Sequence, residues 1–118
     1  ANSLAGFRRL GNPWGAGLTL GALANLKLQA GELAAARQLA EEGQALRKQV
    51  GHKHSLGVGL ELLARIALQE HKLEEAAAFY REAILLFESL GNRPYVDELR
   101  AAMSALPATV VARNASEQ

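Results

Sequence analysis

The sequence predicts an all-α protein built from antiparallel helix pairs that stack on one another, and three observations lead to this class. Residues 11–50 align with residues 51–90 at an offset of 40, with 11 identical positions. Hydrophobic residues make up 49% of the chain, and Ala and Leu, both strong helix formers, dominate them. Glycines recur at equivalent joints, Gly11, Gly51 and Gly91. A fixed period in this range is typical of repeat architectures, in which each unit packs on the next.

Length and charge narrow the functional classes. The chain has 118 residues, which suits one domain, and its net charge of +1 is too balanced to indicate a nucleic-acid or membrane field. It contains no cysteine, no apolar run long enough to span a bilayer and no secretory signal. We therefore expect a cytoplasmic protein. Because the chain lacks an initiator Met and opens inside a helical pattern, we also expect it to be part of a longer protein.

The first repeat contains signals for two helices. Residues 3–10 have the apolar spacing of a helix end, and Gly11 suits the C-terminal cap. Pro13 suits the first position of the next helix, which runs to a break at Gly31. Apolar residues at helical spacing then predict a second helix over residues 33–50.

The second repeat follows the same plan. Helices are expected over about residues 55–70 and 73–90, and Pro94 opens a closing helix that ends at Pro107. The predicted domain is thus 1–106, with a partial helix 3–10, repeats 13–50 and 54–90, and a closing helix 94–106; residues 107–118 are expected to be a frayed tail without helical period.

Small residues occupy equivalent places in both repeats, at Ala24 and Ala36 and again at Ala64 and Ala76. Such residues allow helices to approach closely, toward interaxial distances of about 8–10 Å. We expect all four to be buried between helices.

The repeat resembles the tetratricopeptide repeat. The residues that carry the resemblance are Leu23-Ala24, Gly31-Glu32-Leu33 and Ala36, followed by Leu63-Ala64, the turn at His71, and Ala76, Tyr80 and Ala83. The usual period of that family is 34 residues, and the period of 40 found here is similar to the longer variety of kinesin light chain and of bacterial peptide-binding regulators. The sequences around Gly11 and Gly91 are similar to those of the C-terminal repeat arrays of bacterial ATPase-type transcriptional regulators.

The resemblance implies a right-handed α-solenoid that binds a protein or peptide in the concave groove lined by the first helix of each pair. It implies a non-enzymatic scaffold module of a larger cytoplasmic regulator, in signalling or transcription. By position, the groove-lining residues would be Leu18, Gly21, Asn25, Leu28 and Gln29 from the first repeat, and Val58, Glu61, Arg65, Leu68 and Gln69 from the second.

Two of these residues have side chains suited to peptides. Asn25 resembles the asparagines with which 40-residue members grip a peptide, since an amide can donate to and accept from an extended backbone. Its counterpart Arg65 departs from that pattern and suits a carboxylate. The clamp of Lys, Asn and Arg that chaperone-type members use for a C-terminal carboxylate is not expected, because most of the relevant places hold Gly21, Leu62, Glu98 and Ala102.

The sequence gives little support for a metal site or a catalytic site. His52 and His54 precede the helix whose far end is marked by His71, about 25 Å away at 1.5 Å per residue, so the three cannot share one ion. The pairs Glu41-Glu42 and Glu74-Glu75 are adjacent and point apart on a helix. Because the sequence also lacks a phosphate-binding loop and a nucleophilic triad, we expect neither an enzyme nor a cofactor.

The basic residues, Trp14 and the ends of the repeat array each have more than one interpretation. Basic residues near the joints, Arg8-Arg9, Arg47-Lys48, Lys53 and Arg93, could form an edge that touches nucleic acid, although placement by the helix dipole is the favoured explanation. Trp14 is expected to staple a joint, and the less favoured alternative is an exposed anchor for a partner. Apolar repeat ends near Phe7 or Leu106 could instead make the array a spacer or a homodimer without a peptide ligand.

Overall fold

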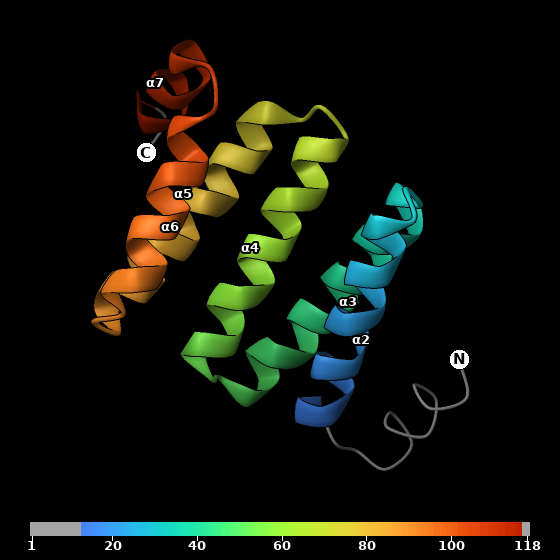
Figure 1. The fold of residues 1–118 in the computed structure, drawn as a ribbon. Coiled ribbons are helices and arrows are strands. Elements are labelled where there is room, and N and C mark those ends of the chain that lie inside the picture. The colour runs from blue at the N-terminus through green and yellow to red at the C-terminus, as the bar shows by residue number, and fades with distance from the viewer. Residues whose placement is uncertain (1–12, 117–118) are drawn as a thin grey trace.

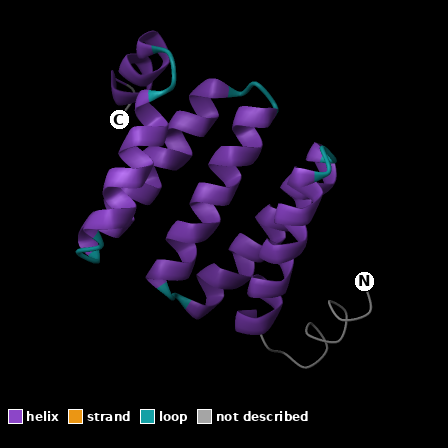
Figure 2. Cartoon of the chain, in the orientation of Figure 1, coloured by secondary structure: helices purple, strands orange, loops and turns teal. Residues whose placement is uncertain are grey.

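The computed structural model describes residues 13–116, and these residues form six helices and no strand (Figures 1 and 2). The helices are α2 (Pro13–Gln29), α3 (Leu33–Val50), α4 (Lys53–Gln69), α5 (Leu73–Ser89), α6 (Arg93–Ser104) and α7 (Ala108–Ser116). The predicted all-α class is therefore confirmed. The predicted partial helix 3–10, with Phe7 and Arg8-Arg9, lies outside the described residues, as does the side chain of Trp14.

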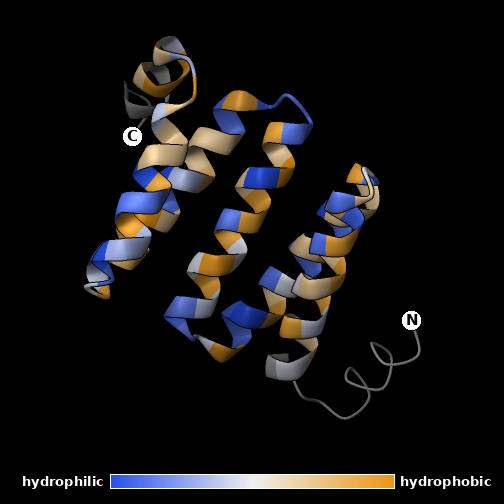
Figure 3. Ribbon diagram, in the orientation of Figure 1, coloured by the Kyte–Doolittle hydropathy of each residue, from blue (hydrophilic) through white to orange (hydrophobic). Residues whose placement is uncertain are grey.

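The helices pack in adjacent pairs. α2 packs on α3, α4 packs on α5, and the pairs meet through α3 against α4, while α6 continues the stack on α5 (Figure 1). Figure 3 shows hydrophobic residues interleaved with hydrophilic ones along α3 to α6, as expected of helices with one apolar face. None of the helices within residues 13–116 is both long and apolar enough to cross a bilayer.

Glycines end the helices where the chain turns. Gly31, Gly51 and Gly91 have φ values of 81°, 76° and 71°, a left-handed conformation that glycine adopts without strain. The Gly51 N–H donates to the Arg47 carbonyl at 2.9 Å and closes the last turn of α3. The turn between α4 and α5 places His71 at φ 61°, forty residues after Gly31.

The core consists of two clusters, one on each side of α4. Between the repeats, Leu62 and Ile66 of α4 pack on Ala24 of α2 and Ala36 of α3. The second cluster centres on Phe87 and joins α4, α5 and α6. The four small residues expected between helices, Ala24, Ala36, Ala64 and Ala76, are fully buried, so that prediction is confirmed.

The C-terminal prediction was wrong in one respect. Residues 108–116 form α7 rather than a tail without helical period, and Val110 and Val111 pack against the second core cluster. Leu106 is accordingly buried, so it does not provide the exposed apolar end that we expected there. The local sequence gave no clear helical period here, because the segment follows Pro107 and contains three consecutive β-branched residues of lower helix propensity, Thr109, Val110 and Val111.

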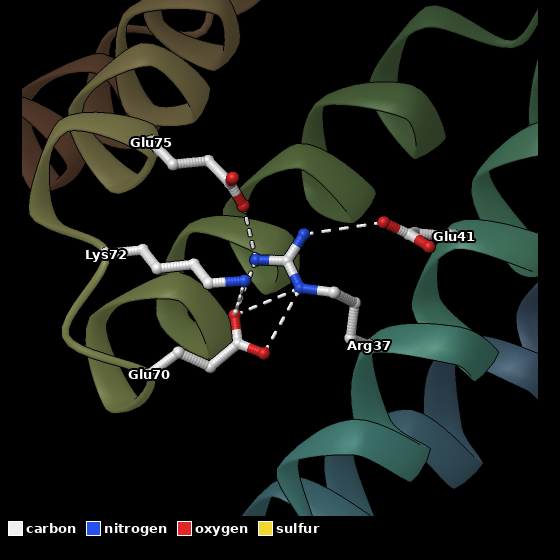
Figure 4. A network of polar contacts seen from close by, with 5 residues as sticks. All are labelled: Arg37, Glu41, Glu70, Lys72 and Glu75. Carbon is white, nitrogen blue, oxygen red and sulfur yellow. Dashed lines mark hydrogen bonds and ion pairs between the residues drawn. The ribbon is translucent and has the colours of Figure 1, made fainter.

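An ion cluster also joins the two repeats (Figure 4). Arg37 of α3 donates from Nη2 to Glu70 at 2.6 Å and also contacts Glu75 of α5 and Glu41 of its own helix. Lys72 lies 3.8 Å from the same Glu70 carboxylate. The pKa of Glu70 is lowered, because Arg37 hydrogen-bonds to its ionised form.

Candidate functional site

A hollow of about 280 Å³ lies between the first helices of the two repeats, α2 and α4. Helical spacing explains how these helices present their residues to one space, because positions three or four apart share a face. Its lining residues are Gly21, Ala22 and Asn25 of α2, Arg47 of α3, and Val58, Glu61, Leu62 and Arg65 of α4.

Half of the residues predicted for the groove meet here. The hollow brings together Gly21, Asn25, Val58, Glu61 and Arg65. The structure does not bring the other five to it. Leu28 is part of the core and Leu68 is half-buried against the second cluster, so the prediction that these two line an open groove was wrong; Leu18, Gln29 and Gln69 are exposed outside the hollow. The reason is that Leu28 and Leu68 lie on the sides of α2 and α4 that face the packed interior.

Asn25 has an unused hydrogen-bonding group in this hollow. Its Oδ1 atom is buried and has no partner among the described residues. A buried polar atom without a partner costs about 1–3 kcal/mol, so native proteins leave few of them. Oδ1 of Asn25 is thus an acceptor at the wall of the hollow whose hydrogen bond the described residues leave unmade.

Arg47 lies at the base of the hollow, and sequence reasoning missed it. We predicted that it would complement the dipole at the end of α3 and contribute to a basic edge, whereas the structure turns it inward and leaves it 5% exposed. Its guanidinium makes no hydrogen bond or ion pair with any other described residue, and its Nε atom is buried without a partner. Burial lowers the pKa of Arg47, but arginine remains a cation in proteins.

Glycines make the space that Arg47 fills. A Cβ atom at Gly21 would lie 2.5 Å from Nη2, and one at Gly59 would lie 2.5 Å from Nη1. A Cβ at Gly17 would lie 3.2 Å from Cγ of the same side chain. The three glycines therefore surround Arg47 from its stem to its tip. The burial of Arg47 had a signal in the sequence, because the arginine aligns with Phe87 of the second repeat and the first helix of its own repeat is rich in glycine.

Glu61 gives the hollow an acidic side. Burial raises the pKa of Glu61, the Glu98 carboxylate on α6 raises it further, and Arg65 opposes the shift. Burial also raises the pKa values of Tyr80 and Tyr95, and the charge of Glu61 adds to both shifts. Glu61 is therefore close to α5 and α6. Arg65, one turn further along α4, is near α5 as well, because it opposes the pKa shifts of both Glu61 and Tyr80.

The histidines of the second joint have structural partners. His52 caps α4 by accepting a hydrogen bond at Nδ1 from the Ser55 N–H, 3.3 Å away. The ring of His54 meets Phe87 and Tyr95 edge to face, with centroids 5.4 and 5.7 Å apart. Over the described part of the chain, no three His, Cys, Asp or Glu residues gather as a metal site would require.

A second hollow, of about 360 Å³, lies among α3, α4 and α5. It is lined mainly by leucines, with Lys48 and Glu82 among them. Gln44 lies at its wall, where Nε2 donates to the Leu56 carbonyl at 2.9 Å and Oε1 has no partner. This hollow has no buried unpaired charge, and the hollow between α2 and α4 is therefore the stronger candidate.

Comparisons of the chain with models of protein families, with curated proteins and with solved structures find no match.

Proposed function

We propose that this chain is a protein- or peptide-binding scaffold module, a right-handed solenoid of the tetratricopeptide type whose ligand lies in the groove between α2 and α4. The observation that carries the proposal is the pair of unsatisfied buried groups in one hollow, Asn25 Oδ1 and the Arg47 guanidinium. Groups of this kind are costly without a ligand, and an extended peptide supplies both donors and acceptors.

The same geometry favours binding over catalysis. The polar side chains that line the hollow are one amide, two arginines and one carboxylate, and no serine, histidine or cysteine nucleophile is among them. We accordingly propose a non-enzymatic module of a larger cytoplasmic regulator, in signalling or transcription, with neither a membrane nor nucleic acid as its partner. No cofactor is part of the proposal.

The test begins with a defined probe. Random dodecapeptides displayed on phage are selected on the immobilised domain, and the recovered sequences are synthesised and titrated by calorimetry. We expect Asn25→Ala combined with Arg65→Ala to weaken binding by at least about tenfold, since each replacement removes a polar contact. The exposed Arg93→Ala is the matched control and should leave affinity unchanged. Recovery of no binding peptide, or equal affinity for the double variant, would refute the groove assignment.

A second candidate function is self-association through α2. Leu18 and Leu26 are 45% and 60% exposed, and they lie eight residues apart on one face of the helix. Two copies could bury this stripe against each other, which would make the array a spacer or homodimer. Light scattering over a range of concentrations decides: a concentration-dependent dimer that Leu26→Glu abolishes supports this function, and a monomer at all concentrations excludes it.

A further inference from the structure

Arg47 occupies a packing position that the second repeat fills with its central core residue. The offset of 40 places Arg47 opposite Phe87, which is fully buried and is the largest such side chain among the described residues. Each side chain packs over the equivalent glycine of the preceding helix, Arg47 over Gly17 and Phe87 over Gly57. The first repeat therefore has a cation at a place where the fold accepts an aromatic ring.

Nothing that the structure describes around this cation neutralises it. Burying a charge without a partner is among the most unfavourable things that a folded protein does. The contrast with Arg37, on the same helix, is direct, because Arg37 contacts the carboxylates of Glu41, Glu70 and Glu75. The tip of Arg47 reaches Gly21, which lines the hollow.

We propose that the guanidinium of Arg47, with Arg65 of α4 lining the same hollow, binds a carboxylate of the peptide that lies in this groove. The inference rests on the proposed function and adds the chemical identity of one ligand group. A guanidinium presents N–H groups in a planar fork that matches a carboxylate, and such charge-assisted bonds are about twice as strong as neutral ones. The absence of a side chain at Gly21 makes room for the tip of Arg47 in the wall of the hollow.

The position of the acidic residue gives the ligand a direction. Glu61 lies in the same hollow but close to α5 and α6, and its charge repels an anion there. The ligand carboxylate is therefore on the side of the hollow near α2 and α3, at Arg47. The unpartnered Asn25 Oδ1 is an acceptor, so it suits an N–H of the ligand backbone and not the carboxylate. This differs from a clamp built on first helices alone, because Arg47 belongs to the second helix of its pair.

The first experiment uses the peptides selected as described above. Each peptide is resynthesised with its Glu and Asp residues changed to amides, with its C-terminus amidated, or with both changes, so that side-chain and terminal carboxylates are tested separately. We expect one of these changes to weaken binding of the peptide to the wild-type domain by about 10- to 100-fold. On Arg47→Met the same change should have almost no effect, since the partner is gone. The exposed Arg93→Met is the matched control and should keep full discrimination.

The outcomes separate this inference from the proposed function. Peptides that bind with the same affinity whether charged or neutral would overturn the carboxylate assignment and leave peptide binding standing. The variant Gly21→Ala keeps the charge of Arg47 but places a methyl group 2.5 Å from the present position of Nη2. It should also weaken binding of the charged peptide, which provides a test if Arg47→Met does not fold. Equal affinity of Gly21→Ala for the charged peptide would count against the inference.

A second experiment needs no peptide. The side-chain Nε–H signals of the arginines are followed by NMR while sodium acetate is added at constant ionic strength, with acetamide as the neutral control. We expect the Arg47 signal to move along a saturating curve with acetate and to stay in place with acetamide. If Arg47 responds no differently from the exposed Arg93, the site does not bind carboxylates, whatever the peptide selection has yielded.

Discussion

The two helix pairs share one backbone plan but differ in the side chains at equivalent positions. In the second repeat, Ile84 and Phe87 are buried in the core that joins α4, α5 and α6. The equivalent positions of the first repeat, forty residues earlier, hold Gln44 and Arg47. All four side chains are at most 7% exposed. The second helix pair therefore gains hydrophobic stabilisation at these two positions. The first helix pair buries polar groups there, and these make few hydrogen bonds within the described residues. The comparison suggests that the second pair stabilises the array and that the first pair provides its binding surface.

The largest expected effect is at Phe87, because this residue is at the centre of the second core cluster. We expect Phe87→Ala to lower the free energy of unfolding by about 3–5 kcal/mol, through lost burial and the cavity left behind. Urea denaturation measures the change. Leu85→Ala on the same helix is the control, since Leu85 is 60% exposed, and it should change stability by less than about 0.5 kcal/mol. Equal losses from the two variants would contradict the comparison.

Arg37 tests what a buried arginine contributes when it is paired. Its side chain is 17% exposed and that of Glu70 is 14% exposed, so Arg37→Met removes the main cation from a largely buried carboxylate, which keeps only Lys72, at 3.8 Å, within the described part of the chain. We expect a loss of roughly 2–3 kcal/mol in the same denaturation experiment, somewhat less than for a fully buried pair. Arg93→Met removes an exposed ion pair with Asp97 and should cost less than about 1 kcal/mol.

The ion cluster also predicts a pH dependence. Because Arg37 lowers the pKa of Glu70 in the folded state, the stabilisation is present above the unfolded pKa of about 4.3. It is lost as the pH falls through the lower pKa of the folded state. Between about pH 5 and pH 2, wild type should therefore lose more stability than Arg37→Met. Parallel curves for the two proteins would show that the cluster contributes nothing.

Arg47 should respond in the opposite direction, because it is unpaired. We expect Arg47→Met to leave stability unchanged or to raise it by about 1–2 kcal/mol, since an apolar side chain of similar length replaces an uncompensated charge. Phe87→Met at the equivalent position is the matched variant, and it should lower stability. A loss of more than about 1 kcal/mol from Arg47→Met would mean that the guanidinium stabilises the fold, and its assignment to a ligand would weaken.

The smallest effect concerns the turns within the two pairs. Gly31 and His71 are equivalent and have φ values of 81° and 61°, but only glycine adopts this conformation without strain. We expect His71→Gly to raise stability by roughly 0.5–1 kcal/mol and Gly31→Ala to lower it by a similar amount. Thermal unfolding measures both. A loss of stability from His71→Gly would indicate that the His71 side chain makes a stabilising contact that outweighs its backbone strain.

Much of the fold was predictable from local signals, because helix boundaries depend on nearby residues. The recurring glycines marked the turns, and the joint at Asn92 was followed by Pro94, as the structure confirms for the start of α6. Helix α7 was missed because its stability comes from the packing of Val110 and Val111 on the core and not from the helix propensity of the segment. Five of the eight residues that line the candidate site were predicted, and five predicted residues lie elsewhere, since periodicity identifies a face but not how far the neighbouring helices cover it.

The sequence by itself determined the helical class, the duplication and the small residues between helices, because all three depend on local propensity and on a pattern repeated along the chain. Only the tertiary structure decided that Arg47 turns inward between Gly21 and Gly59, and that Leu28 joins the core while Asn25 lines the hollow. The physical reason is that burial is a property of neighbouring helices, which come together only when the repeats stack. An arginine at a helix end has the same local sequence whether it faces water or a cavity.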